Sequence, residues 1–203
     1  MSYERRVFIN CPFDSKFNRK FQAIIFTVID CGFDPHCALE IDDGAAIRLK
    51  KIMKLVAECK FGIHDLSRTQ LDSRSKLPRF NMPLELGIFL GAKEFGRGIQ
   101  AQKCCLIMDH SRFRYQKFIS DIAGQDLRDH QSSIARLISH IRDWLQSAEP
   151  TTRLPGGGHI FKRYMMFERI KPTICTAMKL NPKKLTFADE CWVIFDWLKQ
   201  TAV

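Results

Sequence analysis

Short apolar runs alternate with longer amphipathic stretches along most of the chain. The runs are rich in β-branched and aromatic residues and are too short for helices. They predict buried strands at 5–10, 61–66 and 103–108. Two further strands are expected within 33–41, where Pro35 favours an edge position, and within 119–127. Continuous apolar runs of this kind are typical of parallel strands that are covered on both faces.

Between these runs, apolar residues recur at three- and four-residue intervals, which predicts amphipathic helices. The expected helices run from Asp14 or Ser15 to Gly32, from about 45 to 60, from about 82 to 95 and from 134 to 145. Asn81 is expected to be the N-cap of the third helix. This alternation predicts an α/β domain with a four- to five-stranded parallel sheet between layers of helices.

The segment 148–158 differs from its surroundings because it contains two prolines and three consecutive glycines. It predicts a linker between an α/β domain at 1–147 and a basic helical extension at 159–203. In the extension, Thr186 and Asp189 fit a capping box. The apolar stripe expected to dock the last helix comprises Phe187, Cys191, Ile194, Phe195 and Leu198.

The composition narrows the class of protein. The 203 residues are 45% hydrophobic, enough for a sizeable core, and carry a formal net charge of +10. Residues 151–203 hold nine Lys and Arg against four Asp and Glu, so the basic surface favours anionic partners, nucleic acid among them. No apolar stretch is long enough to span a membrane and no secretory leader is recognisable, so a cytoplasmic protein without a membrane partner is expected. The eight cysteines are expected to be reduced, and no C-x-x-C or H-x-x-x-H pair suggests a metal site.

Polar residues follow the predicted strands at their carboxyl ends, where ligands of open parallel sheets bind. Asp65 ends the second strong strand, and Glu85 lies near the start of the helix that follows it. A first-turn position for Glu85 would place its carboxylate in the favourable field of the helix dipole, which predicts an ionised group at the crevice. The residues expected to line this crevice and bind the ligand are Asn10, Cys11, Pro12, Phe13, Asp14, Ser67, Asn81 and Asp121.

A fixed carboxylate at such a crevice suits the cleavage of a glycosidic bond, because it can stabilise an oxocarbenium-like transition state or trap the sugar as an ester. Glu85 is the candidate for this role. Asp65 is the nearest candidate acid for a leaving purine or pyrimidine, which needs a proton. Nicotinamide needs none, because it leaves as a neutral molecule from a cationic pyridinium. NAD+ is therefore the leading substrate, and no bound cofactor is expected.

Three motifs resemble those of bacterial Toll/interleukin-1 receptor (TIR)-like and nucleoside deoxyribosyltransferase-like proteins, over roughly residues 5–145: "FINCPFD", "HDLS" and "FNMPLELGIFLGAK". In that family a D-L-[ST] strand end precedes an N-x-x-x-E-L-G helix, here Asn81 to Gly87. The resemblance implies a flavodoxin-like fold and hydrolysis or transfer at an N-glycosidic bond by Glu85. It also suggests a latent anti-phage effector that a homo-oligomer or a defence-system partner protein would activate.

Several alternatives stay open. Arg79 and Phe80 stand where deoxyribosyltransferases carry an aspartate and a G-T pair, which weakens a transferase but leaves a nucleoside or nucleoside-monophosphate glycosidase. A non-catalytic nucleotide sensor and a self-assembling interaction module need no catalytic Glu85. The stretch 112–121 mixes basic and aromatic residues that can bind a nucleotide or single-stranded nucleic acid, although a helix with a basic solvent face explains it equally well. His64, on an apolar strand, is expected to be a core histidine.

Overall fold

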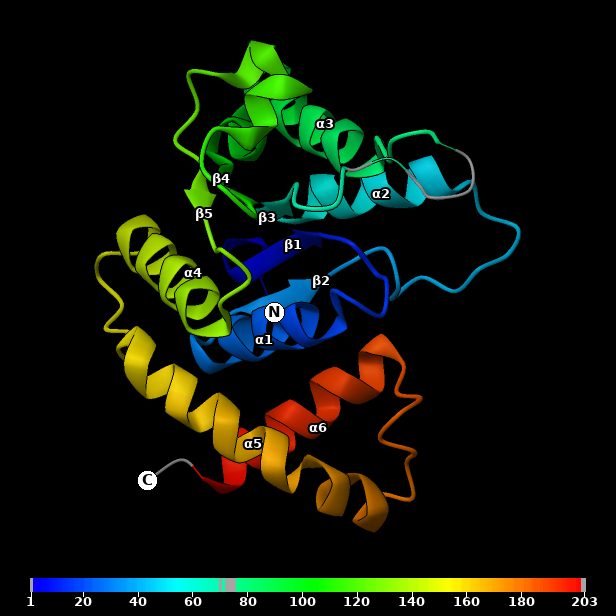
Figure 1. Ribbon diagram of the computed structural model, residues 1–203, viewed down its shortest axis with the longest axis vertical. Coiled ribbons are helices and arrows are strands. Elements are labelled where there is room, and N and C mark those ends of the chain that lie inside the picture. The colour runs from blue at the N-terminus through cyan, green and yellow to red at the C-terminus, as the bar shows by residue number, and fades with distance from the viewer. Residues whose placement is uncertain (1, 70, 72–75, 202–203) are drawn as a thin grey trace.

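A computed structural model of the protein describes residues 2–69, 71 and 76–201. Five parallel strands form one sheet in the order β2-β1-β3-β4-β5 (Figure 1). The strands are β1 Arg6–Asn10, β2 Asp34–His36, β3 Phe61–Asp65, β4 Cys104–Asp109 and β5 Arg128–Asp129. The predicted α/β class with a parallel sheet is confirmed, the strand order is that of a flavodoxin-like fold, and Pro35 lies in the edge strand as expected.

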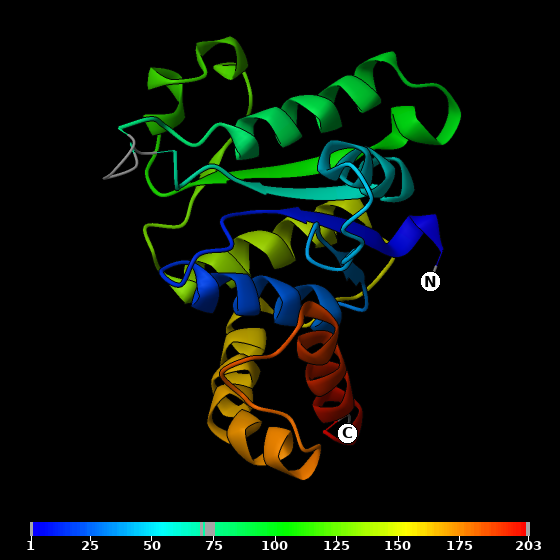
Figure 2. The same ribbon diagram turned by 90° about the vertical axis from the view of Figure 1, so that its right-hand side faces the viewer.

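Helices cover both faces of the sheet. The α-helices are α1 Asn18–Asp30, α2 Arg48–Glu58, α3 Asn81–Phe95, α4 Ile134–Ala148, α5 Gly157–Ala177 and α6 Phe187–Gln200. Short 3-10 helices are η1 Tyr3–Arg5, η2 Gly98–Gln102, η3 Arg114–Lys117 and η4 Ser120–Ile122. Figure 2 shows α2 and α3 on one face, α1 and α4 on the other, and α5 and α6 packed outside α1 and α4.

The strand register brings polar residues to one edge of the sheet. Asn10 pairs with His64, and Asp109 at the end of β4 pairs with Asp129 at the end of β5. Asp65 ends β3 one residue beyond His64. Because the strands are parallel, the loops that follow β1, β3, β4 and β5 all leave from this carboxyl edge.

The two C-terminal helices share one core with the α/β layers. Phe26 of α1 is fully buried, and its ring centroid lies 5.5 Å from that of Tyr164, 5.4 Å from that of Phe167 and 5.8 Å from that of Trp197. The residues of α5 and α6 belong to the same apolar cluster as β1, α1 and α4. The proline- and glycine-rich segment between Ala148 and Gly157 therefore connects two helices of a continuous core.

The predicted capping box is confirmed. Thr186 Oγ1 accepts a hydrogen bond from the Asp189 backbone N–H at 3.1 Å, and Asp189 Oδ2 accepts one from the Thr186 N–H at 2.9 Å. The predicted buried stripe of α6 is wrong in part. Phe195 is 48% exposed, whereas Trp197 and Val193 lie on the buried face, because α6 is rotated to contact α1 and α5.

Two predictions about 112–127 are wrong. Residues 119–127 form η4 and turns, and the strand β5 begins only at Arg128, because Arg128 and Asp129 are the residues that pair with β4. The stretch 112–121 is not a regular helix. Phe113 has a φ of 62°, in the left-handed region, so the segment turns twice as η3 and η4 instead of propagating an α-helix.

Candidate functional site

Two cavities lie at the carboxyl edge of the sheet. We call the first, of about 300 Å³, the arginine cavity; it is lined by Pro12, Phe13, Asp14, Arg48, Arg68, Arg79, Asn81 and Met82. We call the second, of about 280 Å³, the lysine–histidine cavity; it is lined by Lys16, Phe17, Lys20, Ser67, Arg68, His110, His130 and Ser132. Arg68 lines both cavities, so they are neighbours.

The residues predicted to form one crevice are divided between these cavities. Pro12, Phe13, Asp14 and Asn81 line the arginine cavity, and Ser67 lines the lysine–histidine cavity. The predicted crevice position of Asp121 is wrong, because this residue is exposed in η4 and lines neither cavity. The apolar residues around it, Tyr115 and Ile122 among them, pack against the α3 side of the sheet and leave Asp121 facing solvent.

Glu85 lies one turn beyond the residues of α3 that line the arginine cavity, Asn81 and Met82. The helix begins at Asn81 with Phe80 as its N-cap, so the cap role predicted for Asn81 and the first-turn position predicted for Glu85 are both wrong. Glu85 is only 4% exposed. It belongs to the second turn, where the helix dipole has little effect.

Burial dominates the electrostatics of Glu85. It raises the pKa of this carboxyl group to about 7, and the positive charge of Arg48 lowers the pKa by a smaller amount. Near neutral pH the protonated and ionised forms are therefore both populated, and the group is not the permanently ionised carboxylate expected from a first-turn position. A carboxyl group with a pKa close to the working pH is suited to catalysis.

The buried carboxyl group predicts a specific dependence of stability on pH. Burial raises the pKa of Glu85 from its ordinary value of 4.5 to about 7. The folded state therefore holds this proton more tightly than the unfolded state. The stability that the protonated carboxyl group contributes is complete below pH 4.5 and is lost as the pH rises through 7. Glu85→Gln cannot ionise, so at pH 8 its free energy of unfolding should exceed that of the wild type by roughly 1–3 kcal/mol. Urea unfolding of both proteins at pH 4.5 and pH 8 measures this difference.

The matched control is Glu94→Gln, on the same helix but exposed to solvent. It should show the same stability difference from the wild type at both pH values, because an exposed carboxyl group ionises alike in the folded and unfolded chain. A difference between wild type and Glu85→Gln that does not grow with pH would contradict the burial of an ionisable Glu85.

Asn10, Cys11 and His64 shape the carboxyl edge but line neither cavity. The side-chain amide of Asn10 donates to the Met82 carbonyl at 2.9 Å and lies 3.0 Å from His64 Nδ1, which ties β1 to β3 and α3. Burial raises the pKa of the Cys11 thiol well above its ordinary value, so it is not a ready nucleophile. Burial lowers the pKa of His64 to about 3, which agrees with the expected core histidine.

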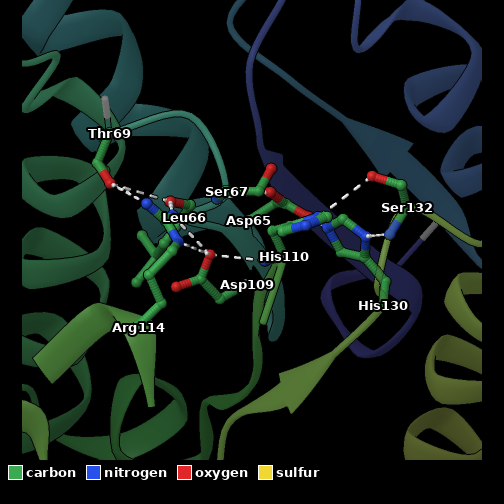
Figure 3. A network of polar contacts seen from close by, with 9 residues as sticks. All are labelled: Asp65, Leu66, Ser67, Thr69, Asp109, His110, Arg114, His130 and Ser132. Carbon is green, nitrogen blue, oxygen red and sulfur yellow. Dashed lines mark hydrogen bonds and ion pairs between the residues drawn. The ribbon is translucent and has the colours of Figure 1, made fainter. Parts of the chain in front are cut away.

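Asp65 is fully buried and contacts two residues that line the lysine–histidine cavity, Ser67 and His130, the latter in the loop after β5 (Figure 3). Its Oδ1 accepts a hydrogen bond from the Ser67 N–H at 2.9 Å, and its Oδ2 lies 3.1 Å from His130 Nε2, without the directional geometry of a hydrogen bond. His130 Nδ1 accepts from the Ser132 N–H at 3.0 Å. The ring proton of a neutral His130 is therefore on Nε2 and faces Asp65.

An arginine clamp fixes the ends of β3 and β4 beside this pair (Figure 3). Arg114 donates to Asp109 Oδ1 through Nη2 at 2.6 Å and through Nε at 2.9 Å, and its Nη2 also donates to the Leu66 carbonyl at 2.7 Å. Burial raises the pKa of Asp109, and Arg114 opposes this effect. The charge of Arg114 is thus paired inside the protein, whereas Arg112 and Lys117 of the same stretch are exposed.

Sequence reasoning missed the cationic residues of both cavities. Lys16 and Arg68 lie in loops, and Lys20 and Arg48 lie in the first turns of α1 and α2. Isolated basic residues at such places carry no distinctive sequence pattern. His130 follows β5, and placing that strand correctly would have put this histidine at the carboxyl edge.

Among the described residues, no helix has the length and apolarity needed to cross a membrane. Within the same residues, no cluster of three or more His, Cys, Asp and Glu side chains is arranged to hold a metal ion. No known protein-family model matches the chain, and no curated protein is significantly similar to it.

Proposed function

We propose that the protein is a nucleotide N-glycosidase that hydrolyses NAD+ to nicotinamide and ADP-ribose, with Glu85 at the reacting centre. The observation that carries this proposal is a buried carboxyl group, whose pKa burial raises to about 7, one helical turn from a cavity lined by three arginines. The arginines suit the phosphates of a dinucleotide, and the carboxyl group suits the charge that develops on the ribose.

The chemistry follows from the two charge states of Glu85. A cationic nicotinamide–ribose unit near the carboxyl group would favour its ionised form, because the two charges attract. The carboxylate then stabilises the oxocarbenium-like transition state as the C1′–N bond breaks and the bond electrons leave with neutral nicotinamide. Water adds at C1′ and loses one proton, which yields ADP-ribose.

The surroundings of Asp65 favour NAD+ over ordinary nucleosides. A purine or pyrimidine needs a proton donor to leave, and Asp65 is the candidate acid that the sequence offers. Its Oδ1 is occupied by the Ser67 N–H and its Oδ2 faces His130, so it offers no free acid to the arginine cavity. Nicotinamide departs without a proton and makes no such demand.

Low accessibility of Glu85 supports a latent enzyme. Glu85 is 4% exposed and is not among the residues that line the arginine cavity, so a substrate in this cavity reaches the carboxyl group only after neighbouring side chains move. Self-assembly or a defence-system partner that favours the open arrangement would switch the activity on. Control of this kind fits an anti-phage effector, because constitutive loss of NAD+ would harm its own cell.

The test measures the bases that the protein releases. The protein is assayed in purified form and after expression in bacteria with and without phage challenge. Mass spectrometry of NAD+, nucleosides and nucleoside monophosphates should show loss of NAD+ with equimolar nicotinamide. Release of free purines or pyrimidines would move the substrate to nucleosides or monophosphates. Absence of any released base under every condition would reject the enzyme and leave a nucleotide sensor or an assembly module.

A further inference from the structure

The lysine–histidine cavity collects positive charge without a carboxylate in its lining. Among the described residues that line it, Lys16, Lys20 and Arg68 are cationic, and the others are aromatic, hydroxyl or imidazole side chains. Within the described part of the chain, Lys16 and Lys20 form no ion pair, although Lys20 Nζ lies 5.3 Å from the centre of the Phe17 ring. Arg68 is partly neutralised by Asp14, 3.3 Å away.

Two long helices begin at this cavity. Lys16 and Phe17 immediately precede α1, and Ser132 immediately precedes Ser133, the N-cap of α4. Helix N-termini carry partial positive charge and attract anions. The field of both helices therefore adds to that of the lysines, and the cavity volume of about 280 Å³ far exceeds the roughly 30 Å³ that one water occupies.

Hydrogen-bonding groups in the cavity are held in place by contacts with one another (Figure 3). His130 is 1% exposed and anchors the backbone of Ser132, and the Ser132 hydroxyl lies 3.2 Å from His110 Nδ1. Gln131 and Ser132 have φ values of 47° and 59°, which non-glycine residues rarely adopt. The structure thus fixes a serine and a histidine beside the two lysines.

We propose that the lysine–histidine cavity is a binding site for a phosphoryl oxyanion, the phosphate or diphosphate group of a nucleotide. Lys16 and Lys20 supply charge, and Ser67, His110 and Ser132 supply hydrogen bonds to the phosphoryl oxygens. The anion belongs either to a nucleotide that extends past Arg68 from the arginine cavity or to a separate phosphorylated ligand. This site stands on its own cavity and does not depend on catalysis by Glu85.

Calorimetry of the full chain with inorganic pyrophosphate as the probe tests the proposal. The double variant Lys16→Gln/Lys20→Gln should bind pyrophosphate at least about tenfold more weakly than the wild type, since two charge-assisted contacts are lost. His110→Gln should weaken binding less. Lys117→Gln, exposed on η3 and outside both cavities, is the control and should bind as the wild type does. Thermal unfolding verifies that each variant is folded.

Titrations with ADP-ribose distinguish the two sources of the anion. If one nucleotide spans both cavities, Lys16→Gln/Lys20→Gln and Arg48→Gln should each weaken ADP-ribose binding; if the ligands are separate, only Arg48→Gln should. Equal pyrophosphate binding by the wild type, the double variant and the Lys117→Gln control, or no binding at millimolar concentrations, would overturn the oxyanion site. Because no turnover is measured, a failure of the glycosidase proposal leaves this result unchanged.

Discussion

Glu85→Gln is expected to lower kcat/KM for NAD+ hydrolysis by about 10²–10⁴-fold, the range found when a catalytic acid–base or a charge-stabilising group is removed. Glutamine keeps the shape of the side chain but cannot become an anion, so it cannot oppose the charge that forms on the ribose. The measurement is the rate at which the activated protein releases nicotinamide from NAD+.

The pH profile adds a second signature of the same residue. Because burial raises the pKa of Glu85 to about 7, the ionised fraction grows as the pH rises through 7, and wild-type kcat/KM should rise and then level off above that value. The residual activity of Glu85→Gln should lack this rise.

Two comparisons separate loss of chemistry from loss of structure. Glu94→Gln, exposed on the same helix, should retain wild-type activity. Glu85→Gln should be at least as stable as the wild type at pH 8, so unfolding cannot explain its inactivity. Undiminished activity of Glu85→Gln would remove this residue from the mechanism and, with it, the main support for an N-glycosidase.

Lys171→Met is expected to lower the free energy of unfolding by about 3–5 kcal/mol, the cost typical of removing one member of a buried ion pair. Lys171 of α5 donates to both carboxylate oxygens of Glu190 of α6, at 2.7 and 2.8 Å, and both residues are buried. Among the described residues, the variant leaves the buried Glu190 carboxylate with one side-chain hydrogen-bond donor, Gln22 Nε2 at 3.4 Å. Urea unfolding at neutral pH measures the loss.

The double variant Lys171→Met/Glu190→Met is the matched control. It removes both charges and fills the space with apolar atoms, so it should recover most of the stability lost by Lys171→Met. If both variants were destabilised equally, packing of the lysine stem and not the ion pair would explain the effect. If neither lost stability, α5 and α6 would not contribute to the cooperative core that includes α1.

Local patterns in the sequence determined most of the fold. Continuous apolar runs located β1, β3 and β4, because a strand covered on both faces needs no polar positions. Periodic apolar residues located the helices, and the Thr186–Asp189 box marked the start of α6 from two side chains three residues apart. Glu85 lies near the carboxyl edge of the sheet because α3 follows β3 along the chain, and this order can be read from the sequence.

Tertiary structure decided the rest, because the remaining features depend on contacts between distant segments. The two residues of β5 form a strand only by pairing with β4, so no local pattern could mark them. Asp65 faces His130, which lies 65 positions further along the sequence, and no local pattern indicates that contact. The pKa of Glu85 is raised by burial, a property of the packed protein. The side chains around Arg68 likewise divide one expected crevice into two cavities, one beside a buried carboxyl group and one lined by lysines.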